Sequence, residues 1–394
     1  MRPYRGISPS GKWKQVFAGM IRVLHTADLH LGRSFSSWGA RSAEVHQADL
    51  RHTLDRIGQL AVEHDAQLVV ISGDLFDIHH PPATLVSLVR SWLGNLASRG
   101  IPVGIIPGNH DSYWYEQSVY RNHGFPANTH VFTGATCEQP IPLRLGDTDL
   151  FLYGIAHDHT RERQPLQSMK RRDAGGLHLG MLHATVDPAA GLSVADRYLP
   201  VSSAELVATG LDYIALGHIH RQHDYNLGAT GWASQPGSPE PLALDETGPR
   251  SVNLLSFDDG SPRIERLAIG ERQASRATIE CTGLDPTEIV ERVRQYSGPE
   301  RIVEIILSGT PNAIVDAESI QAETASGFCY LSIVDRTDVA DTGFARAIEH
   351  EQTIRGYFVR SLRERAQFAS EDEREIIDLA LKRGLIALQK RSVR

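Results

Sequence analysis

Three short apolar runs in the first third of the chain constrain its fold most strongly. They are residues 21–26, 68–72 and 103–106. An amphipathic stretch at about residues 42–64 separates the first run from the second. A segment from the proline pair at 81–82 to about residue 98 separates the second run from the third. Proline at a helix start and Gly100 after its end are typical helix boundaries. This β-α-β-α-β order predicts parallel strands with helices packed on them.

The pattern changes in the following 150 or so residues. Residues 143–155 and 251–269 each read as a hairpin, with turn residues Gly146-Asp147 and Asp258-Asp259-Gly260. Residues 177–182 and 213–216 are further strand candidates, and Ser202 and Glu205 have capping-box spacing for a short helix between them. We therefore expect a parallel first half joined to a second half that is mainly antiparallel, ending near Gly270.

Four parts follow from these patterns: an N-terminal extension, a large α/β domain, a compact α/β unit and a helical tail. Their boundaries are residues 1–19, 20–270, 271–340 and 341–394. The tail should form two helical segments, residues 344–367 and 370–389. An apolar stripe from Ile376 to Leu388 is equally consistent with a partner-binding surface and with packing on the chain's own core.

Composition excludes several protein classes. The chain has 394 residues, of which 41% are hydrophobic and 22% are charged, and no apolar run reaches the roughly 18 residues of a membrane span. The three cysteines are far apart and form no CxxC pair, so we expect no disulfide framework and a cytoplasmic location. Residues 1–19 contain no apolar signal region, which favours a disordered extension or an upstream start codon. With a net charge of −8, the chain as a whole does not attract nucleic acid, so a chain like this would bind DNA only through a local basic surface, bound metal or a partner.

Five polar clusters stand at the ends of predicted strands. They are Asp28-Leu29-His30, Gly73-Asp74-Leu75-Phe76-Asp77, Gly108-Asn109-His110-Asp111, His183, and Gly217-His218-Ile219-His220. In an open α/β sheet, ligands bind beyond the carboxyl ends of the strands. If the chain stays extended there, the period of two points both side chains of a D-x-H or H-x-H pair to one side. The glycines allow close approach of the backbone.

The donor types in these clusters predict a metal site. Carboxylate, amide and imidazole donors together suit Mn²⁺, Fe²⁺ or Zn²⁺ better than Mg²⁺ or Ca²⁺. The ligand set of two aspartates, one asparagine and four histidines is too large for one ion, whereas two ions that share a carboxylate would use all seven side chains. Paired ions are typical of phosphate-ester cleavage. Each cluster alone is weak evidence for a metal site, because a lone histidine is more often a structural residue. All five clusters in this order are hard to obtain by chance.

The ordered motifs D-x-H, GDxxD, GNHD, H and GHxH resemble the calcineurin-like metallophosphoesterase superfamily, and HTADLHLG with GDLFD resembles its SbcD-type, YhaO-like branch of DNA double-strand-break repair exonucleases. The resemblance covers residues 20–270 strongly and the rest loosely. It implies a four-layer α/β/β/α sandwich with a small α/β capping domain and C-terminal helices. It also implies two divalent ions, with Mn²⁺ preferred.

The resemblance assigns a role to each motif residue. Asp28, His30 and His220 would hold the first metal, Asn109, His183 and His218 the second, and Asp74 would bridge both. His110 would face the scissile phosphate and protonate the leaving 3′ oxygen. Asp111 would orient His110, although a turn cap is an equally good interpretation of this residue.

Other residues near the motifs remain without a firm role. Some archaeal and eukaryotic relatives place a second catalytic histidine where this chain has Asp77, and we assign no role to Asp77, His79 or His80. Lys170-Arg171-Arg172, with Arg161 and Arg163, is either a phosphate-binding loop or a solvated one. The aromatic residues 113–115 either stack on a base or pack internally.

The sequence and the resemblance together favour a metal-dependent DNA nuclease, a 3′-5′ exonuclease and single-strand endonuclease of a double-strand-break repair complex. Its expected partners are DNA, an SbcC-type coiled-coil ATPase bound by the tail helices, and a second copy of itself. The alternative enzyme is a phosphodiesterase or phosphatase on nucleotides or another small phosphoester. Protein phosphatases usually carry GNHE and GDxVDRG, which differ from GNHD and GDLFD here. A scaffold with a decayed site is disfavoured, since every expected ligand is present.

Overall fold

The computed structural model describes residues 6–7, 13–14, 20–158, 160, 166–187, 200–258, 262–338 and 343–392. The chain divides into two compact units: Met1–Leu242 with Pro249–Glu271, and Ala243–Gly248 with Arg272–Arg394. We call them the catalytic unit and the C-terminal unit. Except for the short strands β1 (Gly6–Ile7) and β2 (Trp13–Lys14), the expected N-terminal extension lies outside the described residues.

The first sheet of the catalytic unit confirms the predicted parallel order. Its strand order is β14-β13-β3-β4-β5-β6. The strands are β3 (Ile21–Thr26), β4 (Leu68–Ser72), β5 (Val103–Ile106), β6 (Thr129–Val131), β13 (Ser251–Phe257) and β14 (Arg263–Ala268). Strands β3 to β6 are mutually parallel, and β13 pairs antiparallel with both β3 and β14. The turn predicted between β13 and β14 falls largely outside the described residues.

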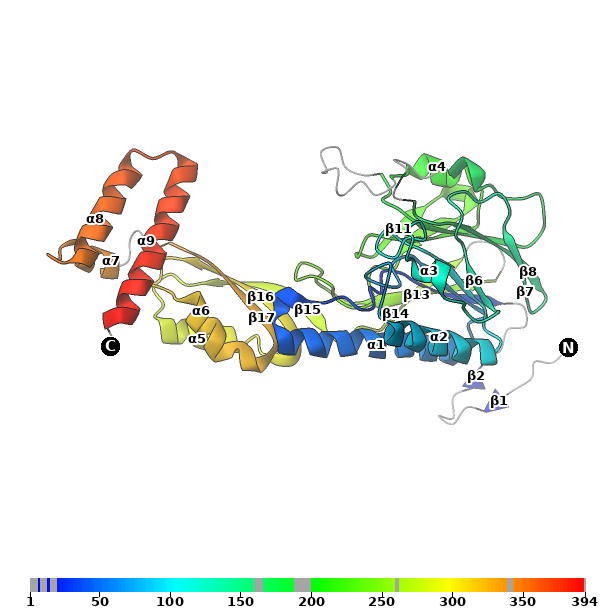
Figure 1. Cartoon of the computed structure of the whole chain (residues 1–394), viewed down its shortest axis with the longest axis horizontal. Helices are drawn as coiled ribbons and strands as arrows, with labels where there is room; N and C mark the ends of the chain where they lie inside the picture. Colours follow the sequence, from blue (N-terminus) through cyan, green and yellow to red (C-terminus); the bar gives the residue numbers. More distant parts are fainter. Residues whose placement is uncertain are drawn as a thin grey trace. The chain divides into compact units, whose positions relative to one another are not determined.

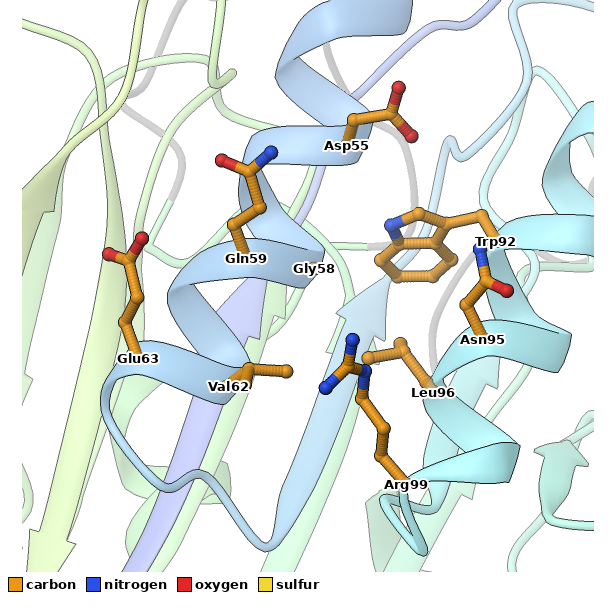
Figure 2. Close-up of a pocket in the computed structure, with 9 residues that line it drawn as sticks. All are labelled: Asp55, Gly58, Gln59, Val62, Glu63, Trp92, Asn95, Leu96 and Arg99. Carbon is orange, nitrogen blue, oxygen red and sulfur yellow. The ribbon is translucent and has the colours of Figure 1, made fainter.

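Helices α1 (Ala40–Glu63) and α2 (Ala83–Ser98) cover one outer face of the catalytic unit (Figure 1). The indole of Trp92 on α2 reaches into the groove between the two helices, beside Gly58 of α1 (Figure 2). A Cβ atom at position 58 would lie only 2.8 Å from the indole nitrogen of Trp92. The absence of a side chain at Gly58 therefore lets the tryptophan pack closely against α1.

The second sheet differs from the expectation of mainly antiparallel pairing. Its order is β11-β12-β10-β9-β8-β7. The strands are β7 (Ile141–Leu145), β8 (Thr148–Ile155), β9 (Leu177–His183), β10 (Tyr213–Gly217), β11 (His223–Asn226) and β12 (Trp232–Gln235). The predicted hairpin β7–β8 is antiparallel, but β8, β9, β10 and β12 are parallel. Longer connections allow this, because parallel neighbours need a crossover rather than a tight turn.

A shared core joins the two sheets face to face. It contains alternate residues of both, among them Val23 and Val70 of the first sheet and Leu152, Met181 and Ala215 of the second. On the outer side of the second sheet, α4 (Ser203–Val207), with the predicted capping box of Ser202 and Glu205, contributes to another core. With α1 and α2 on the opposite face, the layers are α/β/β/α, as the resemblance implied (Figure 1). Within the described residues, no helix is long and apolar enough to cross a bilayer.

Short elements complete the catalytic unit. They are α3 (Val119–Asn122) and the 3₁₀ helices at Ser36–Trp38, Leu166–Ser168 and Gly228–Thr230. The first of these precedes α1, where Phe35 and Trp38 pack on the buried His46 ring. The position of α3 matters for the site, because it directly follows the loop that carries the GNHD motif.

The C-terminal unit contains a three-stranded parallel sheet, β15-β16-β17. Its elements are β15 (Gln273–Glu280), α5 (Pro286–Arg294), β16 (Gly298–Gly309), α6 (Ala317–Thr324), a 3₁₀ turn at Ala325–Gly327 and β17 (Phe328–Thr337). A capping box between Asp285 and Glu288, with Pro286 at the first helical position, begins α5. The order matches the compact α/β pattern expected from the sequence.

The tail forms three helices rather than two: α7 (Gly343–Glu349), α8 (Ile354–Gln367) and α9 (Glu371–Ser392). The additional break arises because the Thr353 side chain accepts a hydrogen bond from the backbone N–H of Gly356 and begins a new helix. The apolar stripe of α9 lies partly in the chain's own core and is partly exposed. Leu381 and Leu385 pack in a core with Val359, whereas Ile376 and Leu379 are exposed.

Candidate metal centre

The five polar clusters meet at the carboxyl ends of strands from both sheets. Strands β3, β4 and β5 lead into the first three clusters, β9 ends at His183, and β10 ends at Gly217. Parallel strands bring their carboxyl ends to one edge of a sheet, and the face-to-face packing brings the two edges together. Residues separated by up to 190 positions therefore come into contact, as His30 and His220 do.

The backbone at the first cluster differs from the extended conformation that the sequence suggested. Asp28 and His30 both have positive φ angles, of 55° and 45°, so the D-x-H segment is a pair of left-handed bends. Backbone hydrogen bonds hold the bends: Asp28 N–H donates to the Gly73 carbonyl at 3.1 Å, and His30 N–H donates to the Asp74 carbonyl at 2.9 Å. The side chains converge because two loops pair with each other, not because of strand periodicity.

One group of donor atoms comprises Asp28, His30 and His220, whose ligand atoms all lie within 4.8 Å of one another. The Nε2 atoms of His30 and His220 are 3.2 Å apart. Asp28 also accepts hydrogen bonds from the backbone N–H of His218, at 2.9 and 3.1 Å to its two oxygens. These bonds fix the carboxylate, so the group is already arranged for a cation.

A second group forms around the amide oxygen of Asn109. This Oδ1 atom lies 2.9 Å from His183 Nε2 and 3.2 Å from His218 Nδ1. His183 Nδ1 donates to the carbonyl of Ser72 at 2.9 Å, which leaves Nε2 to face the other donors. The orientation of His183 is therefore set by the end of the neighbouring sheet's strand β4.

Asp74 lies between the two groups. Its Oδ2 atom is 3.4 Å from His30 Nε2 in the first group and 3.4 Å from His183 Nε2 in the second. Its Oδ1 atom accepts a hydrogen bond from the backbone N–H of His110 at 2.9 Å. A side chain at Gly108 would collide with this carboxylate, so only glycine fits there.

The charges of the buried groups fit a site for cations. Burial raises the pKa of Asp28. Burial also disfavours the charged form of His183, but the Asp74 carboxylate outweighs it and raises the pKa of His183 to about 9; the same pairing holds the pKa of Asp74 well below its usual range despite burial. Burial, with the nearby His183, lowers the pKa of His218 to about 3. A proton on His183 thus neutralises part of the acidic cluster, and a metal cation is the natural replacement for it.

His110 lies at the rim of this cluster, with 38% of its side chain exposed. Its Nδ1 atom donates to the backbone carbonyl of Asp77 at 3.0 Å, which directs Nε2 away from that contact. The Asp77 carboxylate accepts a hydrogen bond from His30 Nδ1 at 2.9 Å and lies 3.3 Å from the guanidinium of Arg33. Asp77, left without a role by sequence reasoning, therefore contacts two of the site's histidines.

Asp111 does not orient His110 in this structure. Its carboxylate accepts hydrogen bonds from the backbone N–H of Gly108 at 2.7 Å, the backbone N–H of Phe76 at 3.1 Å and the Tyr120 hydroxyl at 2.7 Å. Burial, with the nearby Asp74, raises the pKa of Asp111 to about 6. These contacts favour the turn-cap interpretation: Asp111 ties the GNHD loop to the GDLFD loop, and the Asp77 carbonyl is the group that orients His110.

Two further contacts were not found by sequence reasoning. The guanidinium of the buried Arg250 donates to the backbone carbonyl of His220 at 2.8 Å. The Ser72 carbonyl binds His183, as described above. Neither has a sequence signal, because a backbone carbonyl carries no residue type and Arg250 lies outside every motif.

The basic loop and the two histidines after Asp77 lie outside the metal-ligand groups. Arg171 pairs with Asp212 at 2.6 Å, so this part of the basic loop is engaged within the unit, and Arg161 and Arg163 lie outside the described residues. His79 stacks on Tyr115 with ring centroids 4.2 Å apart. His80 is exposed.

A comparison with known families identifies the family of this chain. The family model of the calcineurin-like phosphoesterases matches residues 21–222, about half of the chain, and includes all five clusters. The chain belongs to this family. It is therefore a phosphoester hydrolase of a family that uses divalent metal ions, and the groups around Asp28 and Asp74 are candidate ligands for them.

The relatives of this phosphoesterase include a metallophosphoesterase, a nuclease subunit and a DNA-repair protein by name. The uncharacterized metallophosphoesterase YhaO of Bacillus subtilis is 27% identical over 314 residues, which is 75% of this chain and 74% of YhaO. The SbcD component of the nuclease SbcCD of Escherichia coli is 29% identical over 274 residues, 61% of this chain and 66% of that protein. The DNA double-strand break repair protein Mre11 of Methanosarcina acetivorans is 26% identical over 346 residues, 82% of this chain and 51% of Mre11.

Proposed function

We propose that this phosphoesterase is a DNA nuclease that cleaves phosphodiesters with two divalent ions. Asp28, His30 and His220 would hold one ion, Asn109, His183 and His218 the other, with Asp74 bridging them. Mixed oxygen and imidazole donors suit Mn²⁺, Fe²⁺ or Zn²⁺, and the resemblance to SbcD-type nucleases makes Mn²⁺ the ion we propose. When bound, such a pair of ions activates water and stabilises the charge on the phosphate.

The observation that carries this proposal is the position of Asp74. One oxygen of its carboxylate stands 3.4 Å from an imidazole nitrogen of each group. A carboxylate used by one ion alone would not need histidines of both groups at equal distance. The equal spacing is the arrangement that a shared ligand requires.

His110 is the proposed catalytic residue. The hydrogen bond from its Nδ1 to the Asp77 carbonyl fixes the ring, and the remaining nitrogen, Nε2, is then available to a phosphate held by the ions. As an imidazolium, it would donate the Nε2 proton to the leaving oxygen. Asp111 supports the loop but does not touch the substrate in this proposal.

The choice of DNA as substrate rests on the relatives and on the organisation of the chain. Their names place the SbcD component of SbcCD and Mre11 among nucleases and DNA-repair proteins. We propose residues 20–270 as the nuclease domain, 271–340 as a capping domain and 341–394 as a helical tail that binds a coiled-coil ATPase of the SbcC type. A homodimer is part of the same proposal.

Exposed apolar side chains support a partner for the tail. Ile354 and Phe368, at the two ends of α8, are 84% and 87% exposed, and Tyr357, Ile376 and Leu379 are also exposed. Several large exposed apolar side chains within residues 354–379 favour a surface that a protein partner covers. The tail therefore has the composition of a docking surface as well as the packed contacts of α9.

The decisive experiment is cleavage of end-labelled linear double-stranded DNA by the full chain with Mn²⁺, compared with His110→Ala. We expect loss of nucleotides from an end by the wild type, no loss after chelation, and a reduction of at least about 100-fold in the variant. His52→Ala is the matched control, because His52 is an exposed histidine on α1.

Two outcomes would count against the proposal. Equal cleavage by wild type and His110→Ala would remove His110 from the mechanism. No cleavage of any DNA, together with rapid turnover of methyl p-nitrophenyl phosphate, would favour a phosphodiesterase of small molecules.

A further inference from the structure

Two loops leave the candidate metal centre and contact each other. The first continues from Asp77 through Ile78 and His79, and the second continues from Asp111 through Trp114 and Tyr115. The His79 and Tyr115 rings stack, with an interplanar angle of 27°, and the backbone N–H of Val119 donates to the His79 carbonyl at 2.8 Å. These contacts hold the loops in a fixed relation. We call Ile78, His79, Trp114 and Tyr115 the aromatic rim.

The aromatic rim presents apolar side chains to solvent. Ile78 is 46% exposed and Trp114 is 38% exposed. Among the described residues of the catalytic unit, Val62 and Val207 are the other large hydrophobic side chains with comparable exposure, and they lie on helices. Single exposed apolar side chains are normal, but here two of them stand on loops that begin at the candidate metal centre and are joined by a ring stack, which is a feature that needs a reason.

Trp114 is exposed without being loosely held. Its backbone N–H donates to the Ser112 hydroxyl at 3.3 Å, and that hydroxyl donates to the buried carbonyl of His157 at 3.1 Å. Tyr113 packs edge-on against the Trp114 ring, and the Arg121 guanidinium lies 4.7 Å from the centre of the Tyr113 ring. A rigid loop thus keeps a large flat side chain at the surface, which lowers the entropic cost of binding to it.

The rim adjoins the groups that would contact a phosphate. Ile78 follows Asp77, whose carbonyl binds His110 Nδ1 at 3.0 Å. On the same residue, the Asp77 carboxylate lies 3.3 Å from Arg33, whose guanidinium is partly exposed. A nucleotide whose phosphate lies at His110 would therefore have a cationic side chain near its backbone and an apolar, aromatic surface within reach of its base.

We propose that the aromatic rim is a subsite for an unstacked nucleobase next to the scissile phosphate, with Trp114 as the stacking residue. The inference rests on the proposed nuclease function and narrows its substrate to unpaired strands and frayed ends. In an intact duplex both faces of a base are covered by its neighbours, so only an unstacked base can use the rim. Any base can stack on an aromatic side chain. The subsite would therefore select unpaired over paired DNA but would not select a base sequence.

The test compares two single-stranded oligonucleotides cleaved by the full chain with Mn²⁺. One is intact, and the other has abasic nucleotides beside the cleaved bond. Trp114→Ala should lower kcat/KM for the intact strand by about 5- to 150-fold, the range expected for one stacked base, and leave the abasic strand unchanged. Trp114→Phe should restore most of the loss. Val207→Ala, an exposed apolar residue on α4, is the control and should behave as wild type.

The outcomes separate the rim from the nuclease proposal. If Trp114→Ala lowers kcat/KM equally for both strands, Trp114 only supports the loop and the subsite is refuted. If the wild type cleaves both strands and Trp114→Ala changes neither, the subsite is refuted while the nuclease function stands. If neither strand is cleaved but methyl p-nitrophenyl phosphate is hydrolysed, the nuclease function fails and the subsite with it.

Discussion

Four residues of the candidate metal centre have left-handed backbone conformations that are unusual for side chains other than glycine. Asp28, His30, Asp74 and His218 have φ angles of 55°, 45°, 50° and 99°. Each such conformation costs on the order of 1 kcal/mol or more and persists only where surrounding contacts enforce it. Here the hydrogen bonds between the loops, such as His30 N–H to the Asp74 carbonyl at 2.9 Å, supply those contacts. These bends, rather than an extended backbone, place the side chains of Asp28 and His30 at the site.

At the residue scale, Gly108→Ala should abolish tight metal binding. The added methyl group would collide with the Asp74 carboxylate and its backbone nitrogen, so Asp74 must move out of its central position. We expect a loss of Mn²⁺ affinity of about 100-fold or more in calorimetric titrations. Gly94→Ala is the matched control, since a Cβ atom at this α2 position meets nothing within 4 Å. Unchanged Mn²⁺ binding by Gly108→Ala would mean that Asp74 is not a ligand.

Asp77→Ala should weaken metal binding by about 10- to 100-fold, the usual effect of removing a group that orients a ligand. The reason is that His30 Nδ1 loses its acceptor, at 2.9 Å, and the ring can rotate or change tautomer. Asp77→Asn keeps an acceptor oxygen and should lose less. Asp149→Ala, which removes an exposed carboxylate paired with Arg144, is the control. Equal affinities of Asp77→Ala and wild type in Mn²⁺ titrations would contradict this role.

At the scale of elements, a buried polar contact joins the two sheets of the catalytic unit. His25 of β3 lies 2.9 Å from the Tyr213 hydroxyl of β10, through Nδ1, and 3.2 Å from the Leu216 carbonyl, through Nε2. Burial lowers the pKa of His25 from 6.5 to about 3, so the ring is neutral in the folded protein. The neutral imidazole thus forms part of the interface between the sheets.

This contact predicts sensitivity to acid. Above pH 6.5 the imidazole is neutral in both states and contributes no pH dependence. Between pH 6.5 and about 3 the unfolded chain binds a proton that folded His25 does not, so the free energy of unfolding falls with decreasing pH. At about pH 5 the loss is about 2 kcal/mol from this residue.

Urea unfolding of wild type and His25→Leu at about pH 8 and about pH 5, both with chelator, measures this loss. The variant should be less stable at the higher pH, because the hydrogen bond between His25 and Tyr213 is lost, but should lose about 2 kcal/mol less than wild type on going to the lower pH. Identical losses in the two proteins would show that His25 is not the titrating group.

At the scale of the whole molecule, the metal centre connects loops from both sheets. Asp28 and Asp74 are buried carboxylates contributed by one sheet, and His183 and His218 come from the other. Bound ions would join these loops and neutralise the buried charge. Binding to the folded state alone stabilises it by about 2.7 kcal/mol per site at a ligand concentration about 100 times Kd.

Removal of metal should therefore lower the Tm of the wild type by several degrees, and added Mn²⁺ should restore it. Asp74→Ala should abolish the response at both sites together, because the shared carboxylate is lost. Thermal unfolding with chelator or Mn²⁺ measures the effect. A full Mn²⁺ response in Asp74→Ala would contradict the shared position of this residue.

The sequence by itself determined the parallel strands β3, β4 and β5, the helices between them and the polar clusters at their ends. The reason is local: apolar runs, helix periodicity, Pro81-Pro82 and Gly100 encode each element within its own segment. The same local signals predicted the hairpin β7–β8 and the capping box at Ser202. They did not predict the parallel pairing of β8, β9 and β10, since strand direction depends on how connections pack rather than on strand composition.

Only the tertiary structure decided how the clusters act together. The left-handed bends at Asp28 and His30, the Ser72 carbonyl behind His183 and the Asp77 contacts with His30 and His110 depend on loops far apart in the chain. Asp111 could be an orienting residue or a turn cap in the sequence, and its bonds to Gly108, Phe76 and Tyr120 make it a cap. A residue type determines which bonds a side chain is able to make. The packing of neighbouring segments determines which of those bonds form.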